Sequence, residues 1–218
     1  GSDGEVSTLV EAKAIADNIG YPIMLKAAAG GGGKGIRKVT EESDLEKQFQ
    51  AAQQEALAAF GNGQMYIEKI IYPARHIELQ ILGDQFGHVI HLGERDCSLQ
   101  RNNQKVLEEA PAFGLPAEIR KEIGEAGLKA ARAVSYENAG TIEFLVDLDN
   151  NFYFMEMNTR IQVEHPVTEM VTGVDIVKWQ LKIAAGEPLT LQQDDIALTG
   201  HSIECRINAE NPAFNFAP

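Results

Sequence analysis

The N-terminal part of the chain alternates between helical and strand-like hydrophobic patterns. Apolar residues recur at helical spacing after Thr8 and after Ser43, and each of these two residues stands three positions before a glutamate, as in a capping box. Short apolar runs of the length of strands lie between and after the two helices. We therefore expect a small unit of helices and strands that ends at about residue 71. Its predicted elements are a helix from Thr8 to Ile19, strands 23–27 and 36–39, a helix from Ser43 to Phe60, and a strand 65–69.

Beyond Pro73 the pattern changes to longer strands in which apolar and polar residues alternate, so a larger sheet begins there. The run 94–105 ends a strand in a polar stretch without helical periodicity, and we expect a loop over it. The predicted elements are strands 76–82 and 88–94 joined by a hairpin loop, a helix 116–135, strands 141–146 and 152–157, a helix 175–185, and a strand 201–208.

Composition and charge narrow the classes of partner. The chain has 218 residues and a net charge of -13. Proteins bind nucleic acid phosphates and anionic lipids through basic surfaces. Because this chain is strongly acidic, we expect neither as a partner. No apolar run reaches the roughly 20 residues that cross a bilayer, and the first residues lack the basic and apolar regions of a signal peptide, so we expect a soluble cytoplasmic protein. An opening Gly1-Ser2 and an end directly after a strand-like run predict a fragment of a longer protein.

The run from Gly30 to Gly35 contains more glycine than a turn requires. With Lys34 inside it and Lys26 on the preceding strand, its backbone N–H groups could fold over a polyphosphate. The alternative is a mobile surface loop, which the two lysines make the weaker interpretation. Neither the Walker motif nor the dinucleotide fingerprint has this spacing. The run alone predicts a phosphate site.

A second candidate site lies on the hairpin around Asp149-Asn150. A turn centred there places Glu143 opposite Glu156, with Asn158 two residues along on the same face. Carboxylate and amide oxygens are ligands that magnesium accepts when substrate phosphates complete its shell. The alternative is that both glutamates lie on a solvated face.

The segment 158–166 follows the hairpin and is dense in functional groups. Arg160 could hold a small planar oxyanion with two donors, and Glu164 is placed to act as a base. A surface loop of salt bridges is the alternative here. The run 94–105 likewise is either a second ligand loop or a solvated one.

Four of these segments, in this order, resemble the signatures of the biotin carboxylase component of biotin-dependent carboxylases, a branch of the ATP-grasp fold. The segments are 26–35, 73–78, 94–105 and 156–166. The resemblance implies an α+β ATP-grasp fold with a small glycine-rich lid subdomain, 1–71, and a larger, mainly antiparallel central subdomain flanked by helices, 72–218. It also implies further domains before and after this chain. The family usually has Arg-His where this chain has Asn102-Asn103.

The resemblance further implies a role for individual residues. ATP would be bound by Lys26, Gly31, Gly32, Gly33, Glu68, Lys69, His76, Gln100 and Leu145, and magnesium or manganese by Glu143, Glu156 and Asn158. Bicarbonate would lie against Lys105, Arg160, Gln162 and the backbone of Val163. Glu164 would deprotonate bicarbonate for attack on the γ-phosphate, and Arg206 would stabilise the enolate of biotin.

The partners implied by the resemblance are a biotin carboxyl carrier protein or domain and a carboxyltransferase subunit or domain, within a homo-oligomeric parent enzyme such as acetyl-CoA carboxylase, which serves fatty acid biosynthesis, or pyruvate carboxylase. A eukaryotic parent would lie in the mitochondrial matrix. Two other functions stay open: another ATP-grasp ligase, and a nucleotide-binding fragment without turnover.

Overall fold

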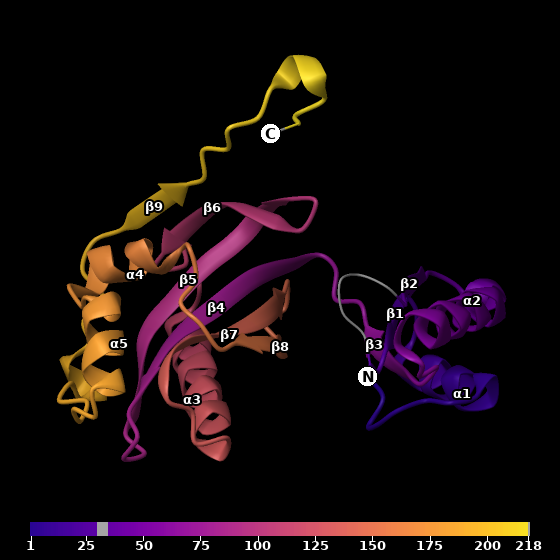
Figure 1. The fold of residues 1–218 in the computed structure, drawn as a ribbon, viewed down its shortest axis with the longest axis horizontal. Helices are drawn as coiled ribbons and strands as arrows, with labels where there is room; N and C mark the ends of the chain where they lie inside the picture. The colour runs from indigo at the N-terminus through magenta and orange to yellow at the C-terminus, as the bar shows by residue number, and fades with distance from the viewer. Residues whose placement is uncertain (30–34, 218) are drawn as a thin grey trace. The chain divides into compact units, whose positions relative to one another are not determined.

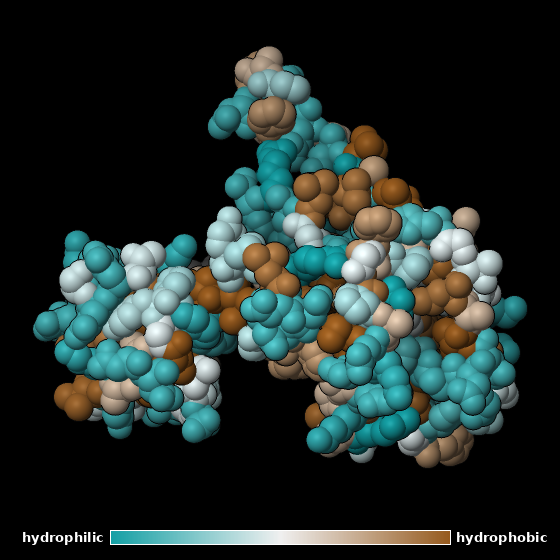
Figure 2. Space-filling view, turned by 180° about the vertical axis from the view of Figure 1, so that it is seen from behind, coloured by the Kyte–Doolittle hydropathy of each residue, from teal (hydrophilic) through white to brown (hydrophobic). Residues whose placement is uncertain are grey.

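The computed structural model describes residues 1–29 and 35–217, and it divides into two compact units, Gly1–Tyr72 and Pro73–Pro218 (Figure 1). Hydrophilic residues predominate on the face shown in Figure 2, with apolar side chains between them. Among the described residues, no helix combines the length and the apolar character that crossing a membrane requires.

The first unit is a three-stranded antiparallel sheet, in the order β2-β1-β3, with two helices. Alternate residues of the central strand, such as Ile23 and Leu25, are buried beneath the helices, whereas Lys26 lies on the opposite face. The elements are α1 (Leu9–Ile19), β1 (Ile23–Ala27), β2 (Ile36–Val39), α2 (Glu42–Phe60) and β3 (Met65–Lys69).

The two predicted helix starts in this unit have different outcomes. Thr8 caps α1, and its side chain and that of Glu11 form the reciprocal bonds of a capping box, as predicted. The capping box predicted at Ser43 is wrong, because α2 begins at Glu42 and Ser43 lies inside its first turn. Gly61 ends α2 in the left-handed conformation, with φ 72°.

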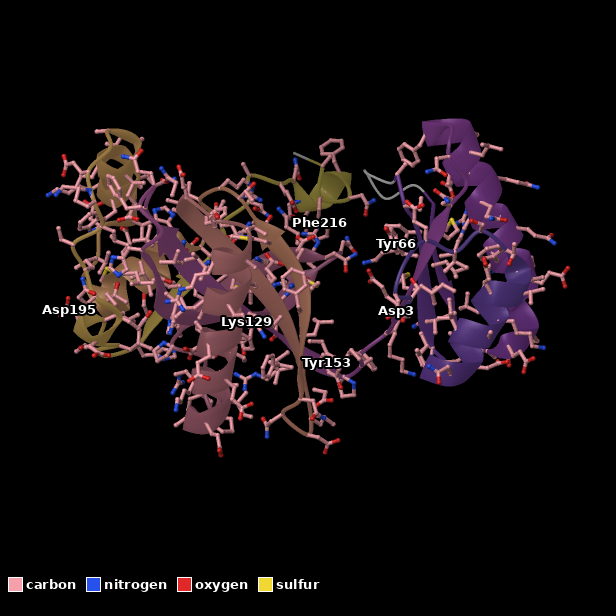
Figure 3. All side chains as sticks on the ribbon, turned by 90° about the horizontal axis from the view of Figure 1, so that it is seen from below. Asp3, Tyr66, Lys129, Tyr153, Asp195 and Phe216 are labelled. Atoms are coloured by element: carbon pink, nitrogen blue, oxygen red, sulfur yellow. The ribbon has the colours of Figure 1, made fainter. Side chains whose placement is uncertain are left out.

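The second unit is built on a six-stranded sheet in the order β8-β7-β4-β5-β6-β9, and every pair in it is antiparallel. Helix α3, labelled at Lys129 in Figure 3, packs on one face. Helices α4 and α5 pack near one end of the other face. The elements are β4 (Ala74–Gly83), β5 (Val89–Arg101), β6 (Gln104–Ala110), α3 (Ala117–Ala133), β7 (Asn138–Asp147), β8 (Phe152–Asn158), α4 (His165–Thr172), α5 (Ile176–Ala184) and β9 (Ser202–Cys205), with short 3-10 turns at Gln193–Asp195 and Pro212–Phe214.

The loop predicted over 94–105 is wrong. Strand β5 continues to Arg101, and β6 starts three residues later at Gln104. The two residues between them, Asn102 and Asn103, have φ values of 51° and 63°, which is the backbone of a tight two-residue hairpin turn. Asparagine tolerates this left-handed region better than most residues, so Asn102-Asn103 suits the turn.

Candidate functional site

A row of charged residues crosses the face of the six-stranded sheet that α3 does not cover. Glu156 on β8 lies opposite Glu143 on β7, Glu143 lies opposite Glu78 on β4, and Glu78 lies opposite Arg95 on β5. Adjacent like charges destabilise a sheet unless cations compensate them. The row therefore requires positive charge in front of it.

Lys105 supplies that charge from the start of β6. Its ammonium donates hydrogen bonds to Glu78 Oε2 at 2.5 Å, to Glu143 Oε1 at 2.8 Å and to Glu164 Oε1 at 2.7 Å. Burial alone would lower the pKa of Lys105, but the three carboxylates outweigh it and raise that pKa. Lys105 is therefore held as a cation at the centre of three glutamates.

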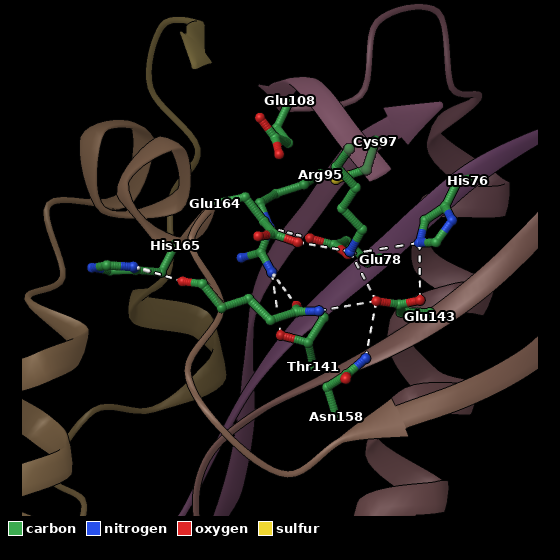
Figure 4. Close-up of polar contacts among 12 residues, drawn as sticks. His76, Glu78, Arg95, Cys97, Glu108, Thr141, Glu143, Asn158, Glu164 and His165 are labelled. Carbon is green, nitrogen blue, oxygen red and sulfur yellow. Dashed lines mark hydrogen bonds and ion pairs between the residues drawn. The ribbon is translucent and has the colours of Figure 1, made fainter. Parts of the chain in front are cut away.

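The pKa of Glu143, the next carboxylate of the row, is also set by its partners. Burial would raise its pKa, but the polar contacts with His76 and Lys105 lower the pKa of Glu143 to about 2. His76 Nε2 lies 3.1 Å from Glu143 Oε2 (Figure 4). Glu143 is accordingly an acceptor with full negative charge at neutral pH.

Glu164 lies between two cations, directly before α4. It is 2% exposed, and its Oε1 accepts from Lys105 while its Oε2 accepts from Arg206 at 2.8 Å. Arg206 in turn donates from Nε to Glu108 on β6 at 2.6 Å. Both oxygens of the predicted base are thus fixed by donors from β6 and from the segment after β9.

The predicted pairing of Glu143 with Glu156 is confirmed, although the turn that joins their strands differs from the prediction. Val146 pairs with Phe152, so the turn is centred on Asp149, and a bulge at Met155 restores the predicted register at the glutamates.

Asn158 lies on the same face as the glutamate pair, as predicted. Its Nδ2 donates to Glu143 at 3.0 Å and to Glu156 at 3.4 Å. This set of groups fits a magnesium ion. A half-turn of the Asn158 amide would exchange its nitrogen for its oxygen, which would then lie beside the carboxylate oxygens of Glu143 and Glu156 as a third oxygen ligand.

Arg95 is a central residue whose role the sequence pattern does not predict. It is fully buried, and its five N–H groups have five acceptors, on residues from β4, β7, α4 and the segment before α4. The acceptors are Glu78 at 2.6 Å, Gln80 at 2.7 Å, Thr168 at 2.9 Å, Thr141 at 3.2 Å and Gln162 at 3.4 Å. Because a guanidinium only donates, it fixes the Gln162 amide with Oε1 toward Arg95 and with Nε2 toward Glu143, at 2.9 Å.

A cavity of about 530 Å³ opens onto this network. Every site residue predicted within the second unit lines it, together with three residues that were not predicted, Asn103, Gln104 and Met155. The predicted residues are His76, Gln100, Lys105, Glu143, Leu145, Glu156, Asn158, Arg160, Gln162, Val163, Glu164 and Arg206. The structure thus brings the predicted metal, anion and base residues of this unit to one site.

Six predicted ATP residues belong to the first unit, and the structure describes three of them, Lys26, Glu68 and Lys69. Lys26 on β1 pairs with Glu68 on β3, at 2.5 Å between Nζ and Oε2. Lys69 Nζ donates to the carbonyl oxygens of Gly20 and Tyr21, at 2.9 and 2.8 Å. The remaining three, Gly31, Gly32 and Gly33, lie outside the described residues, so their predicted phosphate contacts stay a prediction.

Comparisons with known proteins agree on one family. Residues 1–192 match the family described as "Carbamoyl-phosphate synthase L chain, ATP binding domain". The whole chain is 60% identical to a biotin carboxylase of Nostoc sp., of which it covers 49%. It also superposes on the biotin carboxylase domain of the Hydrogenobacter thermophilus 2-oxoglutarate carboxylase (58% identity, TM-score 0.88) and on the Campylobacter jejuni biotin carboxylase (56% identity, TM-score 0.90), covering 48% of each.

The chain spans about half the length of the relatives it matches. Over that half, the mixed α+β architecture is the ATP-grasp arrangement of the matched family and structures. The chain therefore belongs to the carbamoyl-phosphate synthase L chain ATP-binding domain family, in its biotin carboxylase branch.

Proposed function

We propose that the full-length protein containing this chain uses ATP and bicarbonate to carboxylate biotin through carboxyphosphate. The observation that carries the proposal is that Glu164 and the opposed pair Glu143 and Glu156 line the same cavity. In that cavity Glu164 is held by hydrogen bonds from Lys105 and Arg206. A base and a metal site in one cavity are what the activation of an anion by ATP requires. The relatives support it: the H. thermophilus structure is a complex with MgADP, ADP and bicarbonate, and the C. jejuni structure is a β,γ-ATP complex.

The residues proposed for bicarbonate are Lys105, Arg160, Gln162 and the backbone of Val163, all on the cavity wall. Bicarbonate and the nucleotide phosphates repel each other, so they approach only where cations lie between them. Arg160 donates within the chain only to the carbonyl of Ile161 among the described residues, at 3.1 Å. Its remaining donors suit a planar oxyanion.

The proposed nucleotide residues are Lys26, Glu68, Lys69, His76, Gln100 and Leu145 with Gly31, Gly32 and Gly33, and the proposed metal ligands are Glu143, Glu156 and Asn158. Magnesium, or manganese, would neutralise the charge of the phosphates when it is bound there. His76 is positioned by its neighbours, since its backbone N–H donates to Ser98 Oγ and its Nδ1 lies 3.2 Å from Gln100 Nε2.

In the proposed first step Glu164 accepts the proton of bicarbonate while a bicarbonate oxygen attacks the γ-phosphorus. The new O–P bond forms as the bond to ADP breaks, which gives carboxyphosphate. Carboxyphosphate then releases carbon dioxide and phosphate, and that phosphate removes the ureido proton of biotin. The ureido nitrogen attacks carbon dioxide, and Arg206 stabilises the enolate that forms in between.

The direct test is Glu164→Gln in the full-length protein. The amide keeps the shape of the side chain but cannot accept the proton, so bicarbonate-dependent ATP cleavage should fall to background while ATP affinity stays within about twofold, because the change removes a proton-transfer group and no proposed nucleotide contact. Glu125→Gln, an exposed change on α3, is the matched control and should leave both quantities at the wild-type value. Unchanged turnover in the Glu164 variant would remove this residue from the mechanism.

The partners of the full-length protein follow from the same proposal. The acceptor biotin would be carried by a biotin carboxyl carrier protein or domain and would pass its carboxyl group to a carboxyltransferase. The H. thermophilus relative is a dimer, which supports a homo-oligomeric parent. We infer a cytoplasmic enzyme, or a mitochondrial one in a eukaryote.

A further inference from the structure

Arg206 is anchored on two sides by strand β6. Its backbone N–H donates to the carbonyl of Val106 at 3.0 Å, and its Nε donates to Glu108 Oε1 at 2.6 Å. On its other side Arg206 NH2 donates to Glu164 Oε2 at 2.8 Å. NH1 has no hydrogen bond to a protein group within residues 1–29 and 35–217, and Arg206 lines the cavity.

The planar guanidinium divides its donors between opposite edges. Glu108 Oε1 lies 2.6 Å from both Nε and NH2, so it occupies the edge that these two nitrogens share. The edge with NH1 and NH2 is left for Glu164 and the cavity. Without an acceptor behind it, Arg206 could turn about its long side chain and use other donors toward Glu164. Glu108 thus determines which donors of Arg206 reach the site.

Glu108 lies in an unusual environment for a carboxylate, on a strand that is paired on both sides. The side chain is completely buried, and its Oε2 has no hydrogen-bond partner in the described part of the chain. Burial raises the pKa of Glu108, against the opposing effect of Arg206, and Glu204 lies opposite it on β9. A buried carboxylate with an unsatisfied oxygen opposes folding, so its presence behind Arg206 calls for an explanation beyond packing.

A bulge in β6 brings Glu108 to this place. In a regular strand Lys105 and Glu108, three residues apart, would point to opposite faces. The pairing with β5 shifts by one residue at Val106, and this extra residue brings both side chains to one face, where Lys105 bonds Glu164 and Glu108 bonds Arg206. Strand β6 therefore supplies one cation directly to Glu164 and holds the second through Glu108.

We propose that Glu108 is a positioning residue for Arg206, which keeps NH2 on Glu164 and leaves NH1 for the negative charge that develops on the ureido oxygen of biotin. The proposal rests on the proposed function, because it deepens the role given there to Arg206. A purely structural Glu108 would neutralise a half-buried arginine and nothing more. The two roles differ in which step of the reaction they affect.

The test compares ATP cleavage by the full-length enzyme with bicarbonate alone and with bicarbonate plus free biotin. In Glu108→Gln the shape is kept, but the carboxylate charge that holds the Nε edge of Arg206 is removed. The biotin-stimulated rate should therefore fall about tenfold to a hundredfold, the range expected when a hydrogen bond to a charged group loses its charged partner. The KM for ATP should stay within twofold, and Glu108→Asp should recover part of the rate. Glu109, the next residue of β6, contacts exposed His201 and not Arg206. Glu109→Gln is therefore the matched control and should keep wild-type rates.

The outcomes separate the possibilities. The positioning role is overturned if the Glu108→Gln enzyme keeps its stimulation by biotin within twofold of the wild-type value. It is also overturned if both rates fall equally, in proportion to a loss of folded protein. If this variant does not fold, the same ratio measured in Glu108→Asp decides. A wild-type enzyme without bicarbonate-dependent cleavage overturns the proposed function itself, and with it the catalytic meaning of Glu108.

Discussion

The two faces of the six-stranded sheet are built from alternate residues of the same strands but are stabilised differently. On the face under α3, strands β4 and β7 contribute buried apolar side chains such as Ile77 and Phe144. On the other face the same strands contribute Glu78 and Glu143, which are as deeply buried. Apolar burial is non-directional and tolerates small shifts, whereas buried charges require specific partners at hydrogen-bond distance. The second face therefore combines a precise site with a dependence on each member of its network.

The largest expected effect comes from Arg95→Met, which leaves Glu78 buried without the partner that bonds its Oε1. The free energy of unfolding should fall by about 3–5 kcal/mol, as for a buried ion pair that loses one member. ATP affinity per folded molecule should also fall, because Glu78 lies opposite the proposed metal ligand Glu143 and its Oε2 is 3.8 Å from Nε2 of His76, a proposed nucleotide residue. Urea unfolding and calorimetric titration measure the two quantities.

The matched change on the apolar face is Ile123→Ala, at a fully buried position of α3. It should cost about 2–5 kcal/mol in unfolding free energy through lost burial and the cavity left behind. ATP affinity of the folded protein should nevertheless remain at the wild-type value, since Ile123 packs in the apolar cluster under α3, on the opposite face from the charged row. An equal loss of affinity in both variants would contradict the division between the two faces.

A smaller effect on the unfolding free energy is expected when the pH is lowered. The folded-state pKa of Glu143 is about 2, below its ordinary value of 4.5, so ionised Glu143 stabilises the fold above about pH 4.5. That contribution, on the order of 3 kcal/mol, is lost as the pH falls through 2. The difference in unfolding free energy between wild type and Glu143→Gln should therefore shrink from pH 5 toward pH 2. A difference independent of pH would show that Glu143 is not held ionised by its neighbours.

The smallest effect concerns the turn between β5 and β6. Valine at position 102 disfavours the left-handed backbone that Asn102 adopts, so Asn102→Val should lower the unfolding free energy by about 1–2 kcal/mol. Asn102→Gly, which accepts the same backbone without strain, should be close to wild type. Thermal unfolding of the two variants side by side measures the effect, and equal midpoints would contradict the turn geometry.

The sequence predicted most of the helices and strands, because their hydrophobic periodicity is regular. It also predicted the pairing of Glu143 with Glu156, since that register depends only on a nearby turn. The strands over 94–105 were missed, because shifts of pairing beside Leu99 interrupt the alternation that identifies a strand.

The charged network around Arg95 could not be predicted for a different reason. The acceptors of Arg95 are separated from it by 15 to 73 positions along the chain, and only the folded sheet brings them together. Glu108 was missed likewise, because the bulge at Val106 reverses the face on which alternation would place it. A polar residue inside an otherwise apolar strand is the one signal that sequence offers for such positions.

The central claim is that one cavity of the second unit holds the metal and the anion beside Glu164. The most direct measurement is anomalous diffraction from crystals of the full-length protein grown with manganese, ADP and bicarbonate. We expect a manganese peak between the carboxylates of Glu143 and Glu156, with bicarbonate against Arg160 and Glu164. A peak at another site, or bicarbonate bound away from Glu164, would contradict it.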